Sequence, residues 1–346
     1  MKRLVQLAGP VGLISLAGFW ASFLSNERAI EFETTLVYVA VVVSLYVFIG
    51  NSGVISFGQI GFFLVGAYAA GELSIPPDTK SSILPNVFGV IGDHSVGNFW
   101  SLVIAAVAGG LFAFLVGIPL MRLSGLAAGI ATLAVLEITQ NILGNWERIG
   151  PGPLTLSTVP QTTDLWQATV GAIAVACVAF AYQLSPLGRK LRAAREDPFA
   201  AQAAGIDVHR QRLWAFTLSG ALAGFAGGLY IHLQSAINTD IYLDFTFLTL
   251  AMLVVGGSRS LWGAVVGALV ISGLFSFLSD AETGSISWLH LRAGWSSVVV
   301  AAFMAGVLLF LPRGLTGGRE FSFPRGFRPG GRSGAAPERT APRPQE

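Results

Sequence analysis

The chain has 346 residues, of which 53% are hydrophobic and only 12% are charged, and its formal net charge is +2. Soluble domains carry about 25% charged residues, so this composition excludes an ordinary soluble enzyme, a disordered regulator and a nucleic-acid-binding protein. The single cysteine, Cys177, lies in an apolar run, which excludes a disulfide framework and a cysteine-based metal site. We interpret the chain as a polytopic membrane protein.

Apolar segments recur along the chain at a length suited to a bilayer. A helix that spans the hydrocarbon core needs about 20 mostly apolar residues. The candidate segments are 5–24, 35–50, 54–75, 99–121, 123–143, 166–184, 213–233, 245–257, 263–279 and 293–312. Segment 35–50 is short, and 245–257 is too short to span alone, which favours a broken or re-entrant helix there. We predict an all-α polytopic membrane protein with about ten transmembrane or partly re-entrant helices.

The basic residues indicate the orientation of these helices. If the N-terminus lies inside and the chain crosses ten times, 17 of the 21 Lys and Arg residues fall on the inner side. The outer side then holds only Arg28, Lys80, Arg148 and Arg292. Cytoplasmic loops carry the excess of basic residues in membrane proteins. We therefore predict that both termini are cytoplasmic.

Two regions differ from the apolar majority. A cytoplasmic loop at 185–212 belongs to a membrane domain that we assign to 1–312. The remainder, 313–346, is rich in Gly, Pro and Arg and has almost no aliphatic side chains. Such a segment cannot bury enough apolar surface to fold alone, so we expect a disordered basic cytoplasmic tail.

The loop 185–212 shows signals for two short helices. Pro186 can begin the first, Asp197 is a plausible N-cap of the second with Pro198 at its first position, and Gly205 is a natural stop. A compact helix of small residues between charged flanks suits docking into the groove of a partner. The alternative is a solvated basic loop, and the residues alone leave both interpretations open.

Ionisable residues are scarce inside the membrane segments. Glu137 lies within 123–143, with Gln140 and Asn141 one turn further on. A central acidic residue costs about 3 kcal/mol to insert, so Glu137 should face protein or water, either in a structural hydrogen bond or in a pathway. The chain has no Walker A, HExxH, CxxC or nucleophile-elbow pattern. We expect no catalytic residue, no metal site and no energy source of its own.

Three stretches carry a resemblance to a known family. They are NSGVISFGQIGFFLVGAYAAG at 51–71, SPLGRKLRAAREDPFAAQAAGIDVHRQRLWAFTLSGALAGFAGGLY at 185–230 and MLVVGGSRSLWGAVVGALV at 252–270. Together they resemble the LivM-type permease of ABC importers for branched-chain amino acids and related solutes. The sequence departs from that family at Gln59, where a His is common, and at Ser258-Arg259-Ser260, where a small uncharged turn is usual.

The resemblance implies that 189–206 is the coupling element that contacts an ATP-binding subunit. The matching positions are Arg192, Arg195, Glu196, Asp197, Ala200, Ala201 and Gly205. It also implies a second permease subunit, which we expect to be a different chain, and two cytoplasmic ABC ATPases that bind ATP and Mg²⁺. A periplasmic or lipid-tethered binding protein would deliver the solute in the inner membrane of a bacterium. Membrane lipids would be further partners, nucleic acid would not, and this chain itself would bind no cofactor.

We therefore expect a transport subunit, not an enzyme, for branched-chain or other hydrophobic amino acids. The candidate pathway residues are Gln59, Tyr68, Glu137, Gln140 and Asn141. Urea, short amides or sugars are alternative solutes for the same type of permease. An ion-coupled secondary transporter would use Glu137 as its coupling carboxylate. A lipid-modifying enzyme would need clustered His or Asp near one interface, and the sequence shows no such cluster.

Overall fold

The computed structural model describes residues 2–24, 26–84, 87–152, 154–283, 292 and 294–321. Within these ranges the chain is all-helical, apart from one isolated antiparallel bridge between Leu156 and Ile237. The elements are α1 (Lys2–Ala21), α2 (Asn26–Ser52), α3 (Gln59–Ser74), α4 (Pro77–Ile83), α5 (Gly89–Gly92), α6 (Asn98–Leu120), α7 (Gly125–Asn145), α8 (Leu165–Leu184), α9 (Pro186–Glu196), α10 (Pro198–Ala203), α11 (Val208–Gln234), η1 (Thr239–Ile241), α12 (Tyr242–Gly256), α13 (Leu261–Glu282) and α14 (Trp295–Phe310).

Each of the ten apolar segments coincides with one long helix, so the all-helical prediction is confirmed. Six helices, α2, α6, α7, α8, α11 and α13, are long and apolar enough to cross a membrane. The apolar segment 35–50 is short, but helix α2, which contains it, has 27 residues and begins at Asn26. Its first turns are polar, and good helix formers such as Glu and Arg extend a helix beyond the apolar run that hydropathy detects. Helix α12 has only 15 residues, as its short apolar run indicated.

The centre of the molecule is α11, which packs against α6, α3 and α2. Glycines bring the backbones of these helices into direct contact. A Cβ atom added to Gly224 would overlap the Ala105 carbonyl, and one added to Gly227 would overlap the Phe63 carbonyl. Small residues allow this close approach where lipid supplies no hydrophobic drive for helices to associate. Helices α3, α6 and α11 therefore form a closely packed core.

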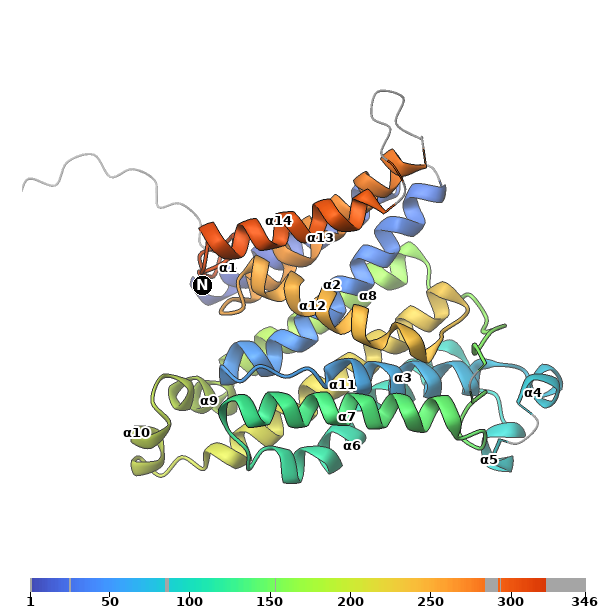
Figure 1. The fold of residues 1–346 in the computed structure, drawn as a ribbon, viewed down its shortest axis with the longest axis horizontal. Coiled ribbons are helices and arrows are strands. Elements are labelled where there is room, and N and C mark those ends of the chain that lie inside the picture. The colour runs from blue at the N-terminus through green and yellow to red at the C-terminus, as the bar shows by residue number, and fades with distance from the viewer. Residues whose placement is uncertain are drawn as a thin grey trace, which may run out of the picture.

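The two ends of the helical bundle differ (Figure 1). Helices α9 and α10 lie at one end together with the start of α1 and the end of α14, and α4 and α5 lie at the opposite end. This arrangement agrees with the prediction that both ends of the membrane domain lie on one side. The cytoplasmic assignment of that side stays a prediction.

The chain remains attached to the bundle beyond 312. The Glu320 carboxylate accepts hydrogen bonds from the backbone N–H of Leu261 at 3.2 Å and from Nε2 of Gln183 at 2.8 Å. Negative charge is favourable at a helix N-terminus, and Leu261 is the first residue of α13. The first part of the predicted tail, 313–321, is thus bound to the helical domain. Residues 322–346 lie outside the described part of the chain.

Candidate functional site

Helices α9 and α10 are defined by the caps that the sequence indicated. Oδ1 of Asp197 accepts hydrogen bonds from the backbone N–H groups of Phe199 and Ala200 at 2.9 and 3.0 Å. Pro198 occupies the first turn of α10. Gly205 has φ +79°, a left-handed conformation that glycine adopts without the strain of a Cβ. The predicted local structure of the loop is therefore confirmed.

One face of the loop is tied to the bundle through small apolar contacts. Ala194 of α9, Ala201 of α10 and Val208 of α11 form a buried cluster, against which Ile206 packs. These contacts hold α10 against α9 and the start of α11. Ala201, one of the predicted coupling residues, is consequently buried and cannot contact a partner directly.

The other face of the loop is open, and α10 presents mainly small side chains on it. Glu196, Asp197, Ala200 and Gly205, four of the predicted coupling residues, are exposed. Phe199 projects from the same surface with 83% of its area exposed. Sequence reasoning gave Phe199 no role. The sequence feature that could have indicated its exposure is its position directly after the capping Asp-Pro pair. A helix of only six residues is too short to bury an aromatic side chain there.

The two remaining coupling candidates turn inward. Nε of Arg192 donates to Oδ1 of Asn51 at 2.8 Å, and its Nη2 donates to the Gln183 carbonyl at 3.2 Å. Nη1 of Arg195 donates to the carbonyl of Gly50. The last carbonyls of a helix carry partial negative charge, which favours a cation there. Arg192 and Arg195 therefore fasten α9 to the end of α2 instead of facing outward.

A crevice of about 690 Å³ lies beside α9 and α10. It is lined by the α2–α3 connection, the start of α7 and three arginines, Arg195, Arg212 and Arg259. Burial lowers the pKa of the Arg195 guanidinium, and the nearby positive charge of Arg259 lowers it further. The three guanidinium groups make the lining of this crevice positively charged.

The predicted pathway residues do not converge on one point. Gln59 and Tyr68 lie on α3, nine positions apart, which is about 13 Å along a helix axis. Both side chains are buried, and the amide of Gln59 and the hydroxyl of Tyr68 have no hydrogen-bond partner among the described residues. Their role in a pathway stays a prediction.

On α7, Glu137 bridges to a neighbouring helix. Its two carboxylate oxygens each lie 3.2 Å from the hydroxyl of Tyr242, the first residue of α12, which donates to them. Gln140 is half-buried, and Asn141 is exposed and donates to the Glu137 carbonyl at 2.8 Å. The structural hydrogen bond between helices that the sequence left open for Glu137 is therefore present.

A buried histidine connects elements that are distant in sequence. Nε2 of His232 lies 2.8 Å from Oγ of Ser101 and 3.3 Å from Oγ of Ser74, and its Nδ1 lies 3.1 Å from the carbonyl of Pro160. Sequence reasoning missed this junction of α11, α6, α3 and the segment before α8. No group of three or more His, Cys, Asp or Glu side chains that could hold a metal occurs in the described part of the chain.

The sequence was compared with known families and proteins. The family described as branched-chain amino acid transport system / permease component matches residues 32–311. The chain belongs to this family. The match runs from within α2 to the residue after α14, and α1 and the residues after 311 lie outside it. The resemblance seen in the motifs is confirmed: the protein is a permease component and a multi-pass membrane protein.

Several curated proteins are similar to this permease. The high-affinity branched-chain amino acid transport system permease protein LivM of Escherichia coli (strain K12) is 26% identical over 345 residues, covering 88% of this chain and 73% of LivM. The probable branched-chain amino acid transport permease protein LivH of Methanocaldococcus jannaschii is 36% identical over 132 residues, 38% of this chain and 40% of LivH. The guanosine ABC transporter permease protein NupQ of Bacillus subtilis (strain 168) is 28% identical over 277 residues, 71% of this chain and 80% of NupQ. No solved structure matches the chain significantly.

Proposed function

We propose that this permease is one half of the translocation pore of an ATP-driven importer for branched-chain or other hydrophobic amino acids. The observation that carries the proposal is the geometry of α9 and α10. The outer face of α10 is open and carries mainly small side chains with one exposed aromatic residue, Phe199, while α9 is bound to the bundle by Arg192 and Arg195. A surface of this kind suits a partner that must push or pull on the membrane helices.

The proposed partner is a cytoplasmic ABC ATPase, two copies of which bind ATP and Mg²⁺. Buried aromatic side chains often supply much of the binding energy of an interface, so Phe199 would enter a pocket of the ATPase. Movement of α10 would pass through α9 and its two arginines to the end of α2. Nucleotide binding favours one of two arrangements of the pore, which alternates its opening between the two sides. This chain supplies no group to ATP hydrolysis.

Further partners are proposed in addition to the ATPase. LivM and LivH are both named as branched-chain amino acid transport permeases. This supports a second, LivH-like permease chain that completes the pore. A periplasmic or lipid-tethered binding protein would deliver the solute, and the complex would lie in the bacterial inner membrane. The relation to NupQ keeps nucleosides, in addition to urea, short amides and sugars, as competing solutes in the test.

The test is reconstitution of the chain with the permease, ATPases and binding protein encoded beside it, followed by uptake of labelled leucine in proteoliposomes. We expect ATP-dependent uptake that also requires the binding protein. Phe199→Ala should reduce co-purification of the ATPase. Phe310→Ala is the matched control, because Phe310 is 84% exposed but belongs to α14. Uptake without ATPase subunits and with a strict dependence on pH or sodium would refute the proposal in favour of a secondary transporter.

A further inference from the structure

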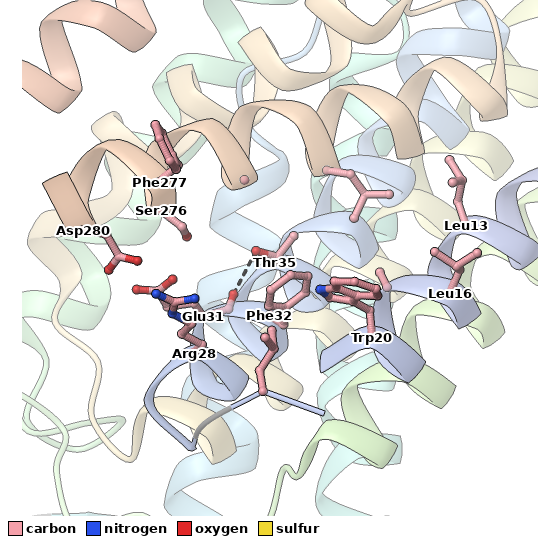
Figure 2. Close-up of a pocket in the computed structure, with 14 residues that line it drawn as sticks. Leu13, Leu16, Trp20, Arg28, Glu31, Phe32, Thr35, Ser276, Phe277 and Asp280 are labelled. Atoms are coloured by element: carbon pink, nitrogen blue, oxygen red, sulfur yellow. Dashed lines mark hydrogen bonds between the residues drawn. The ribbon is translucent and has the colours of Figure 1, made fainter. Parts of the chain in front are cut away.

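A cavity of about 810 Å³ lies between α1, α2 and α13 (Figure 2). This volume falls within the range of small-molecule pockets in proteins. One part of the cavity is apolar and the other is charged, and the two parts are separate in space. The lining of each part indicates what kind of molecule it accepts.

The apolar part is formed by side chains of α1 and α13. Leu13, Leu16 and Trp20 project from α1 (Figure 2), and Leu269 of α13 also lines the cavity. Leu16 and Trp20 are 64% and 62% exposed. In a membrane this wall faces hydrocarbon, so an acyl chain can fill the space from the bilayer and water has no favourable place there.

The charged part lies where α1 and α13 end and α2 begins. Arg28 and Glu31 belong to the first turns of α2, and Asp280 belongs to the last turn of α13. Figure 2 shows these three side chains gathered at one end of the cavity, with Ser276 beside them. In Figure 1 this end is the one opposite α9 and α10. Helix ends and a Trp side chain together mark the level of lipid headgroups.

The charges at this end do not balance one another. Glu31 lies near the negative charge of Asp280 and the positive charge of Arg28, and Ser276 lines the cavity with them. Two carboxylates against one guanidinium leave a formal charge of −1. A ligand that satisfies all three groups must bring an anion for Arg28 and a hydrogen-bonding cation for the two carboxylates.

We propose that this cavity binds a phospholipid whose headgroup carries a phosphate and a primary ammonium, as in phosphatidylethanolamine. The phosphate contacts Arg28, the ammonium donates N–H groups to Glu31 and Asp280, and one acyl chain follows the wall of α1 and α13. An anionic lipid such as phosphatidylglycerol offers no cation to the carboxylates. A choline headgroup offers a cation without any N–H donor.

The lipid would join helices that otherwise meet at few polar contacts. One turn after Glu31, Oγ1 of Thr35 on α2 lies 2.7 Å from Oγ of Ser272 on α13. Helix α1 lies outside the region that matches the family. The bound lipid would therefore fasten this additional helix to the helices of the family fold, and this inference does not depend on which solute is transported.

The experiment is a lipid titration of the purified full-length chain, followed by native mass spectrometry. Phosphatidylethanolamine, phosphatidylcholine and phosphatidylglycerol with identical acyl chains are the probes. We expect phosphatidylethanolamine to bind about tenfold more tightly than the other two, because charge-assisted hydrogen bonds to both carboxylates are lost with them. Equal binding of the three lipids would overturn the proposal.

Variants separate the headgroup contacts from general effects on folding. Glu31→Gln combined with Asp280→Asn should abolish the preference for the ammonium headgroup. Glu33→Gln should keep it, because Glu33 faces Asp164 and the start of α8. Arg28→Gln should weaken the binding of all three phospholipids. If Glu33→Gln removes the preference as fully as the double variant, the proposed headgroup contacts are wrong.

A second pair of variants tests the acyl-chain wall without changing any charge. Gly273 lines the cavity, and a Cβ added there meets no atom within 4 Å, so Gly273→Leu should fill the space and displace the lipid. Gly306 of α14 is equally open, and Gly306→Leu is its control. Unchanged lipid binding by Gly273→Leu would refute the site. Loss of lipid binding when the chain is purified with its partner subunits would assign the cavity to a protein partner and overturn the proposal.

Discussion

The fastening of α9 to α2 gives a prediction about energy transfer. In Arg192→Gln the shorter neutral side chain cannot donate to both Asn51 and the Gln183 carbonyl, which Arg192 reaches at 2.8 and 3.2 Å. The outward surface around Phe199 is unchanged by this substitution. The variant should therefore still bind the ATPase while its transport falls. A loss of coupling with retained binding is the expected signature.

The size of the effect can be estimated from the two hydrogen bonds. A hydrogen bond to a charged group contributes about 1.5–3 kcal/mol. Arg192 is half-buried, so water replaces part of what is lost, and we expect the attachment of α9 to weaken by about 2 kcal/mol. At 1.4 kcal/mol per factor of ten, this corresponds to roughly a thirtyfold weaker attachment. Arg192→Lys keeps the positive charge but lacks the planar guanidinium. The strength of its α9 attachment should therefore lie between those of the unaltered chain and Arg192→Gln.

The assay measures solute uptake and ATP hydrolysis in the same proteoliposomes. The solute transported per ATP should fall by about tenfold or more in Arg192→Gln, on the scale of the weakened attachment. Arg189→Gln is the matched control, because Arg189 is an exposed residue of the same helix. Asn51→Leu should reproduce the defect, and the double variant should be less than additive because the two residues share one contact. An unchanged ratio in Arg192→Gln would refute the role of this contact.

Three further outcomes follow from contacts described above. Gly227→Val should prevent stable folding, measured as loss of a monodisperse peak in detergent, because its side chain would overlap the Phe63 carbonyl; a normal thermal unfolding curve would contradict this. Glu320→Ala should lower the free energy of unfolding by about 1 kcal/mol through loss of the cap on α13, whereas a chain ending at 321 should unfold like the full chain. His232→Ala should cost about 2 kcal/mol in thermal or denaturant unfolding, because the hydrogen bonds of the imidazole to Ser101 and to the Pro160 carbonyl are lost; a change below 1 kcal/mol would show that water replaces the ring.

The helices were predictable where apolar composition alone specifies them. All ten long helices follow apolar runs, since a run of this length has few other stable places. The start of α2 was not predictable from hydropathy, because its polar first turns differ from a loop only in weak helix propensity. The short helices α4 and α5 were missed within the polar segment 76–98 for the same reason.

In the candidate site, too, local features were predictable from the sequence and long-range contacts were not. The caps at Asp197 and Gly205 are local features, and their sequence signals sufficed. The direction of Arg192 and Arg195 depends on the end of α2, more than 130 residues earlier in the chain, and no local pattern contains that information. For the same reason, the sequence, which predicts Lys80 in a loop on the outer side of the membrane, could not show that its side chain is buried and donates to the His94 carbonyl at 2.8 Å.

The glycine contacts of α11 limit how the permease can move. Side chains that interdigitate can exchange rotamers as one helix slides past another, but two backbones in contact have no such adjustable layer between them. Rotating α11 about its own axis against α6 would bring a neighbouring residue that carries a Cβ to the place of Gly224, where that Cβ would meet the Ala105 carbonyl. Helices α3, α6 and α11 must consequently turn as one block. Relative movement is easier at joints such as that between α7 and α12, where Glu137 and Tyr242 meet through their side chains.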